Sequence, residues 1–408
     1  MTSDGTSHGR FRRRAVPLVV LLVVTALFRS TQNAFQTTIG PIGHTVLNLD
    51  PSVIGVGIAL AGAVTTLASL FLVVRLRATR LRTIALTGLT ALATAIVLIV
   101  FGRGLSSFLI SSIIFGMSGG LVIPVLATLA GRVEGVSRDR AISAYTVALS
   151  ASLAVGPFFE SIVLSLNHDS LKGGLLSFLP LPLLALVLFT SMRAQPKQSP
   201  ASTNRPSFPN NLYKSPQFRL AAVALLLYQV PFVAITAFGA LIARYEYGIT
   251  VALAQVSFTV FFLVSLATRS MLVWKHPGDK GGSLLRLSAI LTFAGTILLA
   301  IGHNVIFLFT AIVFLGVPHG FVYPLAISTI SRSTSPRDVP KANAALFATQ
   351  SAASVVSPIL LGATATLFGY QAIALTTLVP VSIFGILLFM MHRAESANPN
   401  FANPSEQA

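Results

Sequence analysis

Arg29, Glu160 and Arg269 carry charged side chains deep inside long apolar segments of this 408-residue sequence. A charge at the centre of a lipid bilayer costs from about 3 kcal/mol upward, so each such residue needs a partner or a task. A buried guanidinium can bind an anion, and a buried carboxyl can carry a proton or neutralise a cation. These residues are therefore the first candidates for chemistry.

Arg29 begins a polar stripe along one predicted helix. Asn33 and Gln36 follow four and seven residues later, which places them on the same helix face, and Gln32 lies beside them. A polar stripe in an apolar helix is expected to face a cavity rather than lipid. Arg29 then pairs with an anionic group of a substrate or with Glu160. The alternative is a structural charge that neighbouring polar groups satisfy.

Glu160 follows Gly156-Pro157 by about one helical turn. In a membrane helix this carboxyl is suited to carrying a proton or to neutralising a cationic substrate. The alternative is an ion pair that locks one conformation. Arg269 lies shortly before Trp274, so we expect its long side chain to reach the lipid headgroups. An inward-facing Arg269 would instead add a positive charge that favours anions.

The second half of the sequence offers polar candidates without a buried carboxyl. Gln229 lies 200 positions after Arg29, next to Pro231, which favours a bend there. His319 and Tyr323 are four residues apart and share a helix face. Gln350 is predicted to line a cavity. For His319, an ordinary hydrogen-bonding role is the alternative.

The elements that position these residues follow from composition. Hydrophobic residues make up 54% of the sequence, charged residues 10%, and the mean hydropathy is +0.80, whereas soluble proteins carry about 25% charged residues. Apolar runs of about 20 residues, long enough to cross a bilayer, recur throughout. They predict an all-α membrane protein with twelve transmembrane helices, at 15–45, 52–74, 83–102, 106–131, 141–166, 173–192, 218–245, 250–274, 284–302, 305–331, 342–367 and 371–391.

The basic residues alternate between loops. One set of loops carries nearly all of them, at 10–14, 75–82, 132–140, 193–219, 275–286, 332–341 and 393. The opposite loops hold only Arg103, Lys172 and Arg244. This bias predicts a multi-pass protein of the plasma (inner) membrane with both termini in the cytoplasm. It also accounts for the net charge of +17 without a nucleic-acid partner.

An internal repeat divides the chain. The segment from Gly116 to Pro124 aligns with the segment from Gly316 to Pro324 at an offset of 200. This spacing predicts two pseudo-symmetric six-helix bundles, at 1–192 and 218–392, with a cytoplasmic linker at 193–217 and a cytoplasmic tail at 393–408. Parallel repeats of this size are typical of transporters that bind substrate between their halves and alternate its access to either side.

These features resemble the major facilitator superfamily over essentially the whole length. Leu47 to Gly55 is similar to that family's first outer loop and second helix, and Gly116 to Pro157 to its fourth and fifth helices. Gly156-Pro157 resembles the Gly-Pro of its proton-linked exporters, which implies a conformational role for these two residues. The resemblance implies a secondary transporter of a small organic solute, coupled to protons and working by efflux or antiport.

Two alternatives remain open at this point. The first keeps the fold and makes the substrate an organic or inorganic anion bound by Arg29. The second is a membrane receptor or scaffold that transports nothing. An enzyme is disfavoured because no nucleophile–base constellation is visible, and no phosphate-binding loop or metal-spaced cluster predicts a cofactor or metal. The expected partners are a small-molecule substrate, protons and membrane lipids, and the expected state is a monomer.

Overall fold

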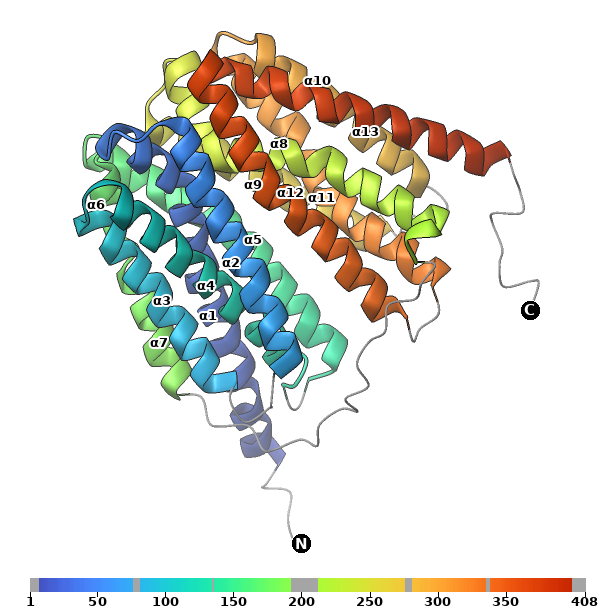
Figure 1. Cartoon of the computed structure of the whole chain (residues 1–408). Helices are drawn as coiled ribbons and strands as arrows, with labels where there is room; N and C mark the ends of the chain where they lie inside the picture. Colours follow the sequence, from blue (N-terminus) through green and yellow to red (C-terminus); the bar gives the residue numbers. More distant parts are fainter. Residues whose placement is uncertain are drawn as a thin grey trace, which may run out of the picture. The chain divides into compact units, whose positions relative to one another are not determined.

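The computed structural model describes residues 7–75, 81–133, 136–191, 212–275, 281–334 and 338–397, and every regular element in them is helical (Figure 1). The helices are α1 (Ser7–Pro41), η1 (Ile42–Val46), α2 (Pro51–Arg75), α3 (Leu81–Phe101), α4 (Gly104–Ala130), α5 (Arg138–Leu166), α6 (Leu171–Leu176), α7 (Pro180–Ser191), η3 (Leu212–Lys214), α8 (Pro216–Glu246), α9 (Val251–Lys275), α10 (Gly281–Ile301), α11 (Val305–Ser333), α12 (Val339–Phe368) and α13 (Gln371–Ala397).

Twelve helical segments in the described part of the chain are long and apolar enough to cross a membrane, which confirms the predicted fold class. The sixth of them, Leu171–Thr190, is broken between α6 and α7. Pro180 explains the break, because proline disfavours helical geometry in the preceding residue and fits the first position of a new helix. The chain bridges the gap with a bond from the Leu181 backbone N–H to the Phe178 carbonyl (3.0 Å).

The chain separates into two compact units. The first comprises Met1–Leu49 and Leu60–Thr203, and the second comprises Asp50–Ala59 and Asn204–Ala408. The division after Thr203 falls inside the expected linker. Most of that linker (192–211) and most of the expected tail (398–408) lie outside the described residues.

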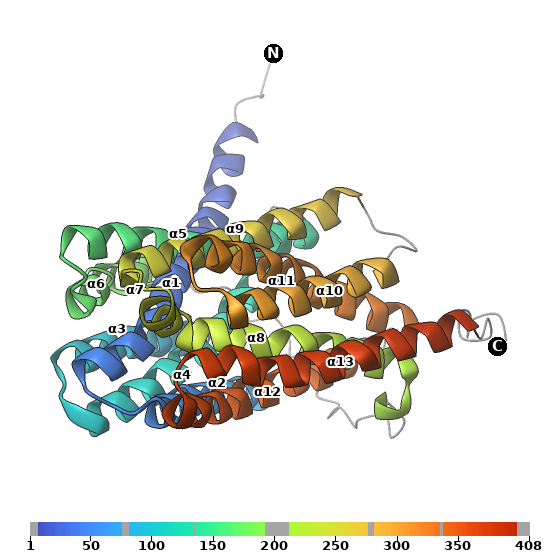
Figure 2. The ribbon, with the colours of Figure 1, turned by 90° about the horizontal axis from the view of Figure 1, so that it is seen from above.

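The internal repeat recurs as matching helix contacts. In the first unit α4 approaches α2 through glycines, and in the second unit α11 approaches α9 in the same way. Helices α9 and α11 lie side by side (Figure 2). The matched pairs are Gly116 over Ala61 with Gly316 over Phe261, and Gly120 over Thr65 with Gly320 over Ser265. Small residues let membrane helices pack this closely.

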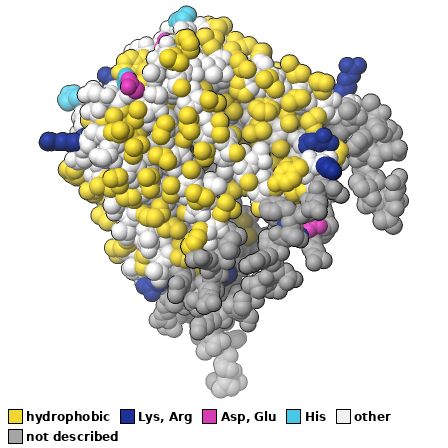
Figure 3. Space-filling model, viewed as in Figure 1, with side chains coloured by type: hydrophobic (Ala, Val, Ile, Leu, Met, Phe, Trp, Pro, Cys, Tyr) yellow, Lys and Arg dark blue, Asp and Glu magenta, His cyan; other side chains and the backbone are white. Residues whose placement is uncertain are grey.

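The surface is apolar, as a bilayer requires. Hydrophobic side chains cover most of the face shown in Figure 3, and the basic side chains visible there lie at its margins. Leu67 on α2 and Ile386 on α13, for example, are 65% and 61% exposed. In water, such exposed apolar side chains would promote aggregation, whereas in a bilayer their contact with lipid is favourable.

Candidate functional site

Helices α1 and α5 form a polar seam inside the first unit. The Ser30 hydroxyl donates to the Ser152 carbonyl (3.2 Å), and the Asn33 side-chain amide donates to the Leu153 carbonyl (2.7 Å). The residue numbers of the paired positions increase together along α1 and α5, so the two helices are parallel. Gly156 lets them approach, because a Cβ atom there would lie 2.6 Å from the Ser30 carbonyl oxygen.

The Glu160 carboxyl is sealed in this seam, with no exposed surface. Its Oε1 accepts a hydrogen bond from the Thr38 hydroxyl, and its Oε2 accepts one from the Thr37 hydroxyl at 3.5 Å. Among the residues that the structure describes, no lysine or arginine lies within ion-pair distance of it. The immediate partners of this carboxyl are therefore neutral hydroxyl groups, and the locking ion pair does not form within the described chain.

Arg29 lies on the same helix in a different environment. Its Nη1 donates to Gln32 Oε1, and its nearest electrostatic neighbour is Tyr145 on α5. The Arg29 Nε atom is buried and makes no hydrogen bond to any residue of the described ranges. Tyr145 is held by a long bond from its hydroxyl to the Ile123 carbonyl on α4 (3.4 Å). The guanidinium thus keeps one donor available.

Arg29 and Glu160 are separated along α1. The hydroxyls that hold Glu160 belong to residues eight and nine positions after Arg29, which corresponds to about 12 Å of helix rise. The pairing of Arg29 with Glu160 that the sequence left open therefore does not occur in the structure. Between them, Asn33 is buried against α5 and Gln36 is half-buried.

In the second unit, α8 and α12 join through a ladder of amides. Gln350 Nε2 donates to Gln229 Oε1 (3.0 Å) and more weakly to the Tyr228 hydroxyl (3.4 Å). Gln229 Nε2 in turn donates to Ser354 Oγ (2.8 Å). Gln229 is buried, whereas Gln350 is half-buried. The structure thus brings these two predicted residues together on neighbouring helices.

His319 on α11 lies inside an aromatic cluster. Its ring stacks on Phe232, with centroids 4.6 Å apart, and lies 5.1 Å from Phe261 and 5.9 Å from Tyr228. Its Nδ1 shares a hydrogen bond with Ser265 Oγ at 2.7 Å. The ring is only 9% exposed. His319 is therefore a packed, hydrogen-bonded residue that connects α8, α9 and α11.

Arg269 turns inward, contrary to the expectation that it reaches the lipid headgroups. Its Nη2 donates to the His319 carbonyl (3.3 Å), and Tyr228 and Tyr323 are its electrostatic neighbours. The inward course follows from the close approach of α9 and α11 at Gly320, which brings the α11 backbone within reach of α9. Tyr323 is 36% exposed and so lies at the edge of this cluster.

Several residues of these clusters were not predicted. The hydroxyls of Thr37 and Thr38 hold Glu160, and Tyr145 lies beside Arg29. A usable signal existed for Thr37, which lies four residues beyond Asn33 on the polar stripe. Phe232 could have been found from the internal repeat, because it lies 200 positions after Gln32, a residue beside the polar stripe.

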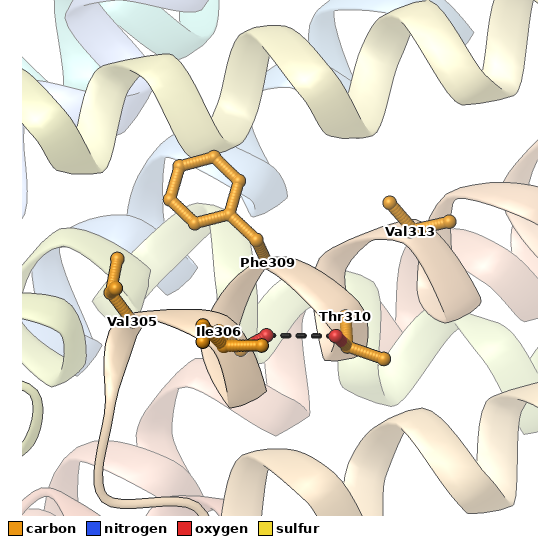
Figure 4. Close-up of a pocket in the computed structure, with 5 residues that line it drawn as sticks. All are labelled: Val305, Ile306, Phe309, Thr310 and Val313. Atoms are coloured by element: carbon orange, nitrogen blue, oxygen red, sulfur yellow. Dashed lines mark hydrogen bonds between the residues drawn. The ribbon is translucent and has the colours of Figure 1, made fainter.

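A surface pocket on α11 has a different character (Figure 4). One helix supplies its whole lining, and the hydroxyl drawn there, that of Thr310, is already bonded to the Ile306 carbonyl at 2.8 Å. Ile306 is 72% exposed. The pocket is an apolar depression of the outer surface and offers no charge to a substrate. Within the described ranges, no group of His, Cys, Asp or Glu residues is arranged to hold a metal ion.

Twelve membrane-length helices in the described part of the chain, arranged in two repeated units, indicate a multi-pass membrane protein. The sequence profile described as Major Facilitator Superfamily matches residues 18–287 and 282–407, so the chain belongs to that superfamily. It is accordingly a transporter of small solutes that works by alternating access, and not an enzyme. Membership also removes the reason to consider a receptor or scaffold.

Solved structures share the fold. The nucleoside transporter NupG is 12% identical, with a TM-score of 0.77 over 92% of this chain and 99% of that chain. A POT family transporter in complex with 5-aminolevulinic acid is 13% identical, with a TM-score of 0.75 over 95% of this chain and 96% of that chain. A bacterial homologue of the lysosomal transporter Spinster is 13% identical, with a TM-score of 0.72 over 93% of this chain and 97% of that one. These identities establish the fold alone, and no curated protein matches the sequence.

Proposed function

We propose that this protein is a proton-coupled secondary transporter that exports a small organic solute, with Glu160 as the group that takes up and releases the proton. One observation carries the proposal: a completely buried carboxyl on α5 is bonded to two hydroxyls of α1. In this family of solute transporters, a charge enclosed in the bundle at a cost of several kcal/mol calls for a function.

Hydroxyl partners suit a group that changes its charge. A threonine hydroxyl can donate to a carboxylate, and it can also accept a hydrogen bond from a protonated carboxyl. Thr37 has a second acceptor available, because its hydroxyl also lies 3.0 Å from the Asn33 carbonyl. Both charge states of Glu160 can therefore be hydrogen-bonded without a large rearrangement. A salt bridge to arginine would instead hold the carboxyl in its charged form.

The same contacts couple the protonation of Glu160 to the packing of α1 against α5. Loss of the charge on Glu160 changes what Thr37 and Thr38 on α1 must satisfy, at the point where α1 and α5 meet. A ligand shifts a conformational equilibrium only through different contacts in the two states, and a proton at Glu160 provides such a difference. Gly156 and Pro157, one turn away, are the positions at which α5 adjusts.

The test is transport in proteoliposomes with an imposed pH gradient. The neighbouring structures include a nucleoside transporter and a 5-aminolevulinic acid complex, so the first radiolabelled probes are uridine and 5-aminolevulinic acid, and benzoate is added as a simple organic anion. We expect the gradient to accelerate the flux of a transported probe in the direction opposite to proton flow. In Glu160→Gln, that acceleration is lost while exchange without a gradient remains. Transport that ignores the gradient in the parent protein would overturn the coupling.

A second candidate is an anion transporter that uses Arg29. The unpartnered, buried Nε of this guanidinium favours it, because a carboxylate or phosphate would satisfy that donor. Loss of anion binding in Arg29→Ala, together with retention in Glu160→Gln, would support the anion assignment. The opposite pattern would support the proton-coupled organic solute.

Orientation and location form a separate part of the proposal. The alternating basic loops support a plasma (inner) membrane protein with both termini in the cytoplasm. We further propose that it is a monomer whose partners, besides the solute, are membrane lipids and protons. The sequence contains no cysteine, so single cysteines introduced at Arg103 and Arg219 can be labelled without background. We expect an impermeant maleimide applied outside cells to modify the first position and not the second.

A further inference from the structure

The two units fill one packing position in opposite ways. In the first unit Gly119 leaves room for Gln32, whose amide nitrogen lies 2.5 Å from the position that a Cβ atom of residue 119 would take. At the positions 200 residues later, the ring of His319 fills that space and Phe232 stacks on it. Since the fold accepts either arrangement, packing alone does not require the aromatic one.

Arg269 shows the same asymmetry. Its counterpart in the first unit is Ser69, whose hydroxyl donates to the Gly120 carbonyl on α4 at 3.3 Å. Arg269 donates to the His319 carbonyl on α11, also at 3.3 Å. A small hydroxyl therefore provides a comparable helix-to-helix hydrogen bond, to a carbonyl one position further along the repeat. The positive charge of Arg269 has no counterpart at this position of the first unit.

The aromatic cluster around His319 presents ring surface at its edge. Phe232 is half-buried and lies between His319 and Phe261, at centroid distances of 4.6 and 6.0 Å. Tyr323, which with Tyr228 is an electrostatic neighbour of Arg269, is 36% exposed. Offset stacking at 4.5–7 Å is the arrangement that aromatic rings prefer, so another planar ring would fit the exposed face of such a cluster.

Hydrogen-bonding groups border the same cluster. Gln350 is half-buried and bonded to the Tyr228 hydroxyl, and Tyr228 lies against both His319 and Arg269. A guanidinium pairs with a carboxylate through two parallel hydrogen bonds, which is stronger and more directional than pairing with a neutral acceptor. Aromatic faces next to one guanidinium thus match a planar ring that bears a single acidic group.

We propose that the second unit contains a binding subsite for a small aromatic carboxylic acid, in which Arg269 pairs with the carboxylate and the more exposed rings of the cluster, Phe232 and Tyr323, pack against the aromatic ring. This assignment rests on the proposed transport function, because it names the substrate class. It differs from the Arg29 alternative in its residues, in its unit and in requiring an aromatic ring as well as a charge.

The probes that test it separate charge from aromaticity. Isothermal titration calorimetry of the purified full-length protein in detergent would measure the affinities of benzoate, cyclohexanecarboxylate and benzamide. We expect benzoate to bind, cyclohexanecarboxylate to bind several-fold more weakly because it cannot stack, and benzamide to bind at least about tenfold more weakly because it has no charge. Equal affinity for benzoate and cyclohexanecarboxylate would overturn the aromatic part, and equal affinity for benzoate and benzamide the acidic part.

Matched variants locate the subsite. Arg269→Gln is expected to weaken benzoate binding at least about tenfold, the effect of losing a charge-assisted pair. Arg244→Gln makes the same change of charge on the exposed end of α8 and is expected to leave the affinity unchanged. Phe232→Leu keeps Arg269 in place, so it should abolish the preference for benzoate over cyclohexanecarboxylate. Unchanged benzoate affinity in Arg269→Gln, with monodisperse folded protein, would overturn the proposal.

The outcome is distinguishable from that of the transport proposal. If benzoate fails to bind while another probe still shows flux that depends on Glu160, the subsite is wrong and proton coupling stands. If benzoate binding depends on Arg269 while the pH gradient has no effect on flux, the subsite stands and proton coupling is wrong.

Discussion

The carboxylate of Glu160 on α5 accepts a hydrogen bond from the hydroxyl of Thr38 on α1, so a buried acid of one helix is held directly by its parallel neighbour. Arg29, on the same helix as Thr38, lies about two turns away and has a different set of neighbours. This separation divides the first unit into a sealed acidic position and a guanidinium with a donor to spare. The two roles proposed for this unit, proton handling and anion binding, therefore fall on different residues.

Replacing Thr38 by valine keeps the shape of the side chain and removes the hydroxyl. Glu160 then loses one of its two hydroxyl donors, and loss of a hydrogen bond to a buried, charged group costs about 1–3 kcal/mol. We expect a lower Tm in detergent and a weaker response of transport to a pH gradient. Thr146→Val on the exposed face of α5 is the control, because that hydroxyl bonds only to its own helix. Equal Tm values for the two variants would contradict the assigned role.

Gly156→Ala tests the close approach of α1 and α5. The added methyl would lie 2.6 Å from the Ser30 carbonyl oxygen, so the helices must separate. Overpacking of this kind typically costs about 1–3 kcal/mol, and we expect both the Tm and the transport rate to fall. Gly385→Ala is the matched control, because a methyl there meets only a leucine side-chain carbon at 3.8 Å. A Gly156→Ala protein as stable and active as this control would show that the seam is loosely packed.

Gln350→Leu interrupts the amide ladder of the second unit. The buried Gln229 would lose the donor to its Oε1 atom, and a buried polar group left unpaired costs about 1–3 kcal/mol. The expected result is a fall in Tm measured by differential scanning fluorimetry. Phe347→Leu, on the exposed face of the same helix, should leave the Tm nearly unchanged.

Tyr247, in the loop after α8, gives a prediction about pH. Its hydroxyl donates to the Leu299 carbonyl (3.0 Å), and burial, followed by the neighbouring Glu246 carboxylate, raises the pKa of Tyr247 to about 12. The unfolded phenol ionises near its ordinary pKa of 10.0. The folded state therefore keeps this contribution to stability below pH 10 and loses it progressively as the pH rises toward 12. In Tyr247→Phe, the fall in unfolding free energy over that range should be shallower. An identical pH profile would contradict the burial of this hydroxyl.

The sequence predicted the fold well because both signals, the length of the apolar runs and the repeat at an offset of 200, can be found without knowing which side chains touch. Apolar runs predicted the twelve spans that the described residues contain. The repeat of Gly116 at Gly316 recurs in the structure as matching glycine contacts of α4 with α2 and of α11 with α9. The break in the sixth span was missed, although Pro180 marks it. Because this segment is apolar throughout, its hydropathy predicts one continuous span, and the effect of a single proline on the helix is not visible in that pattern.

The clusters of side chains were harder to predict because they depend on packing between helices. The sequence around Glu160 does not indicate that Thr38 is its hydrogen-bond partner, because the two residues are 122 positions apart. Arg269 was expected to extend to the headgroups because it lies near Trp274 at the end of a helix. The glycine-mediated approach of α11 brought the His319 carbonyl within its reach instead.

The most direct test of the central claim is the release of protons when substrate binds. Purified protein in weakly buffered detergent solution would be mixed with a transported probe, and a pH indicator would report the protons set free. For a transporter that exchanges solute for protons through Glu160, we expect about one proton per bound molecule from the parent protein and none from Glu160→Gln, although the variant still binds the probe. Equal proton release from both proteins, or none from either, would contradict the account.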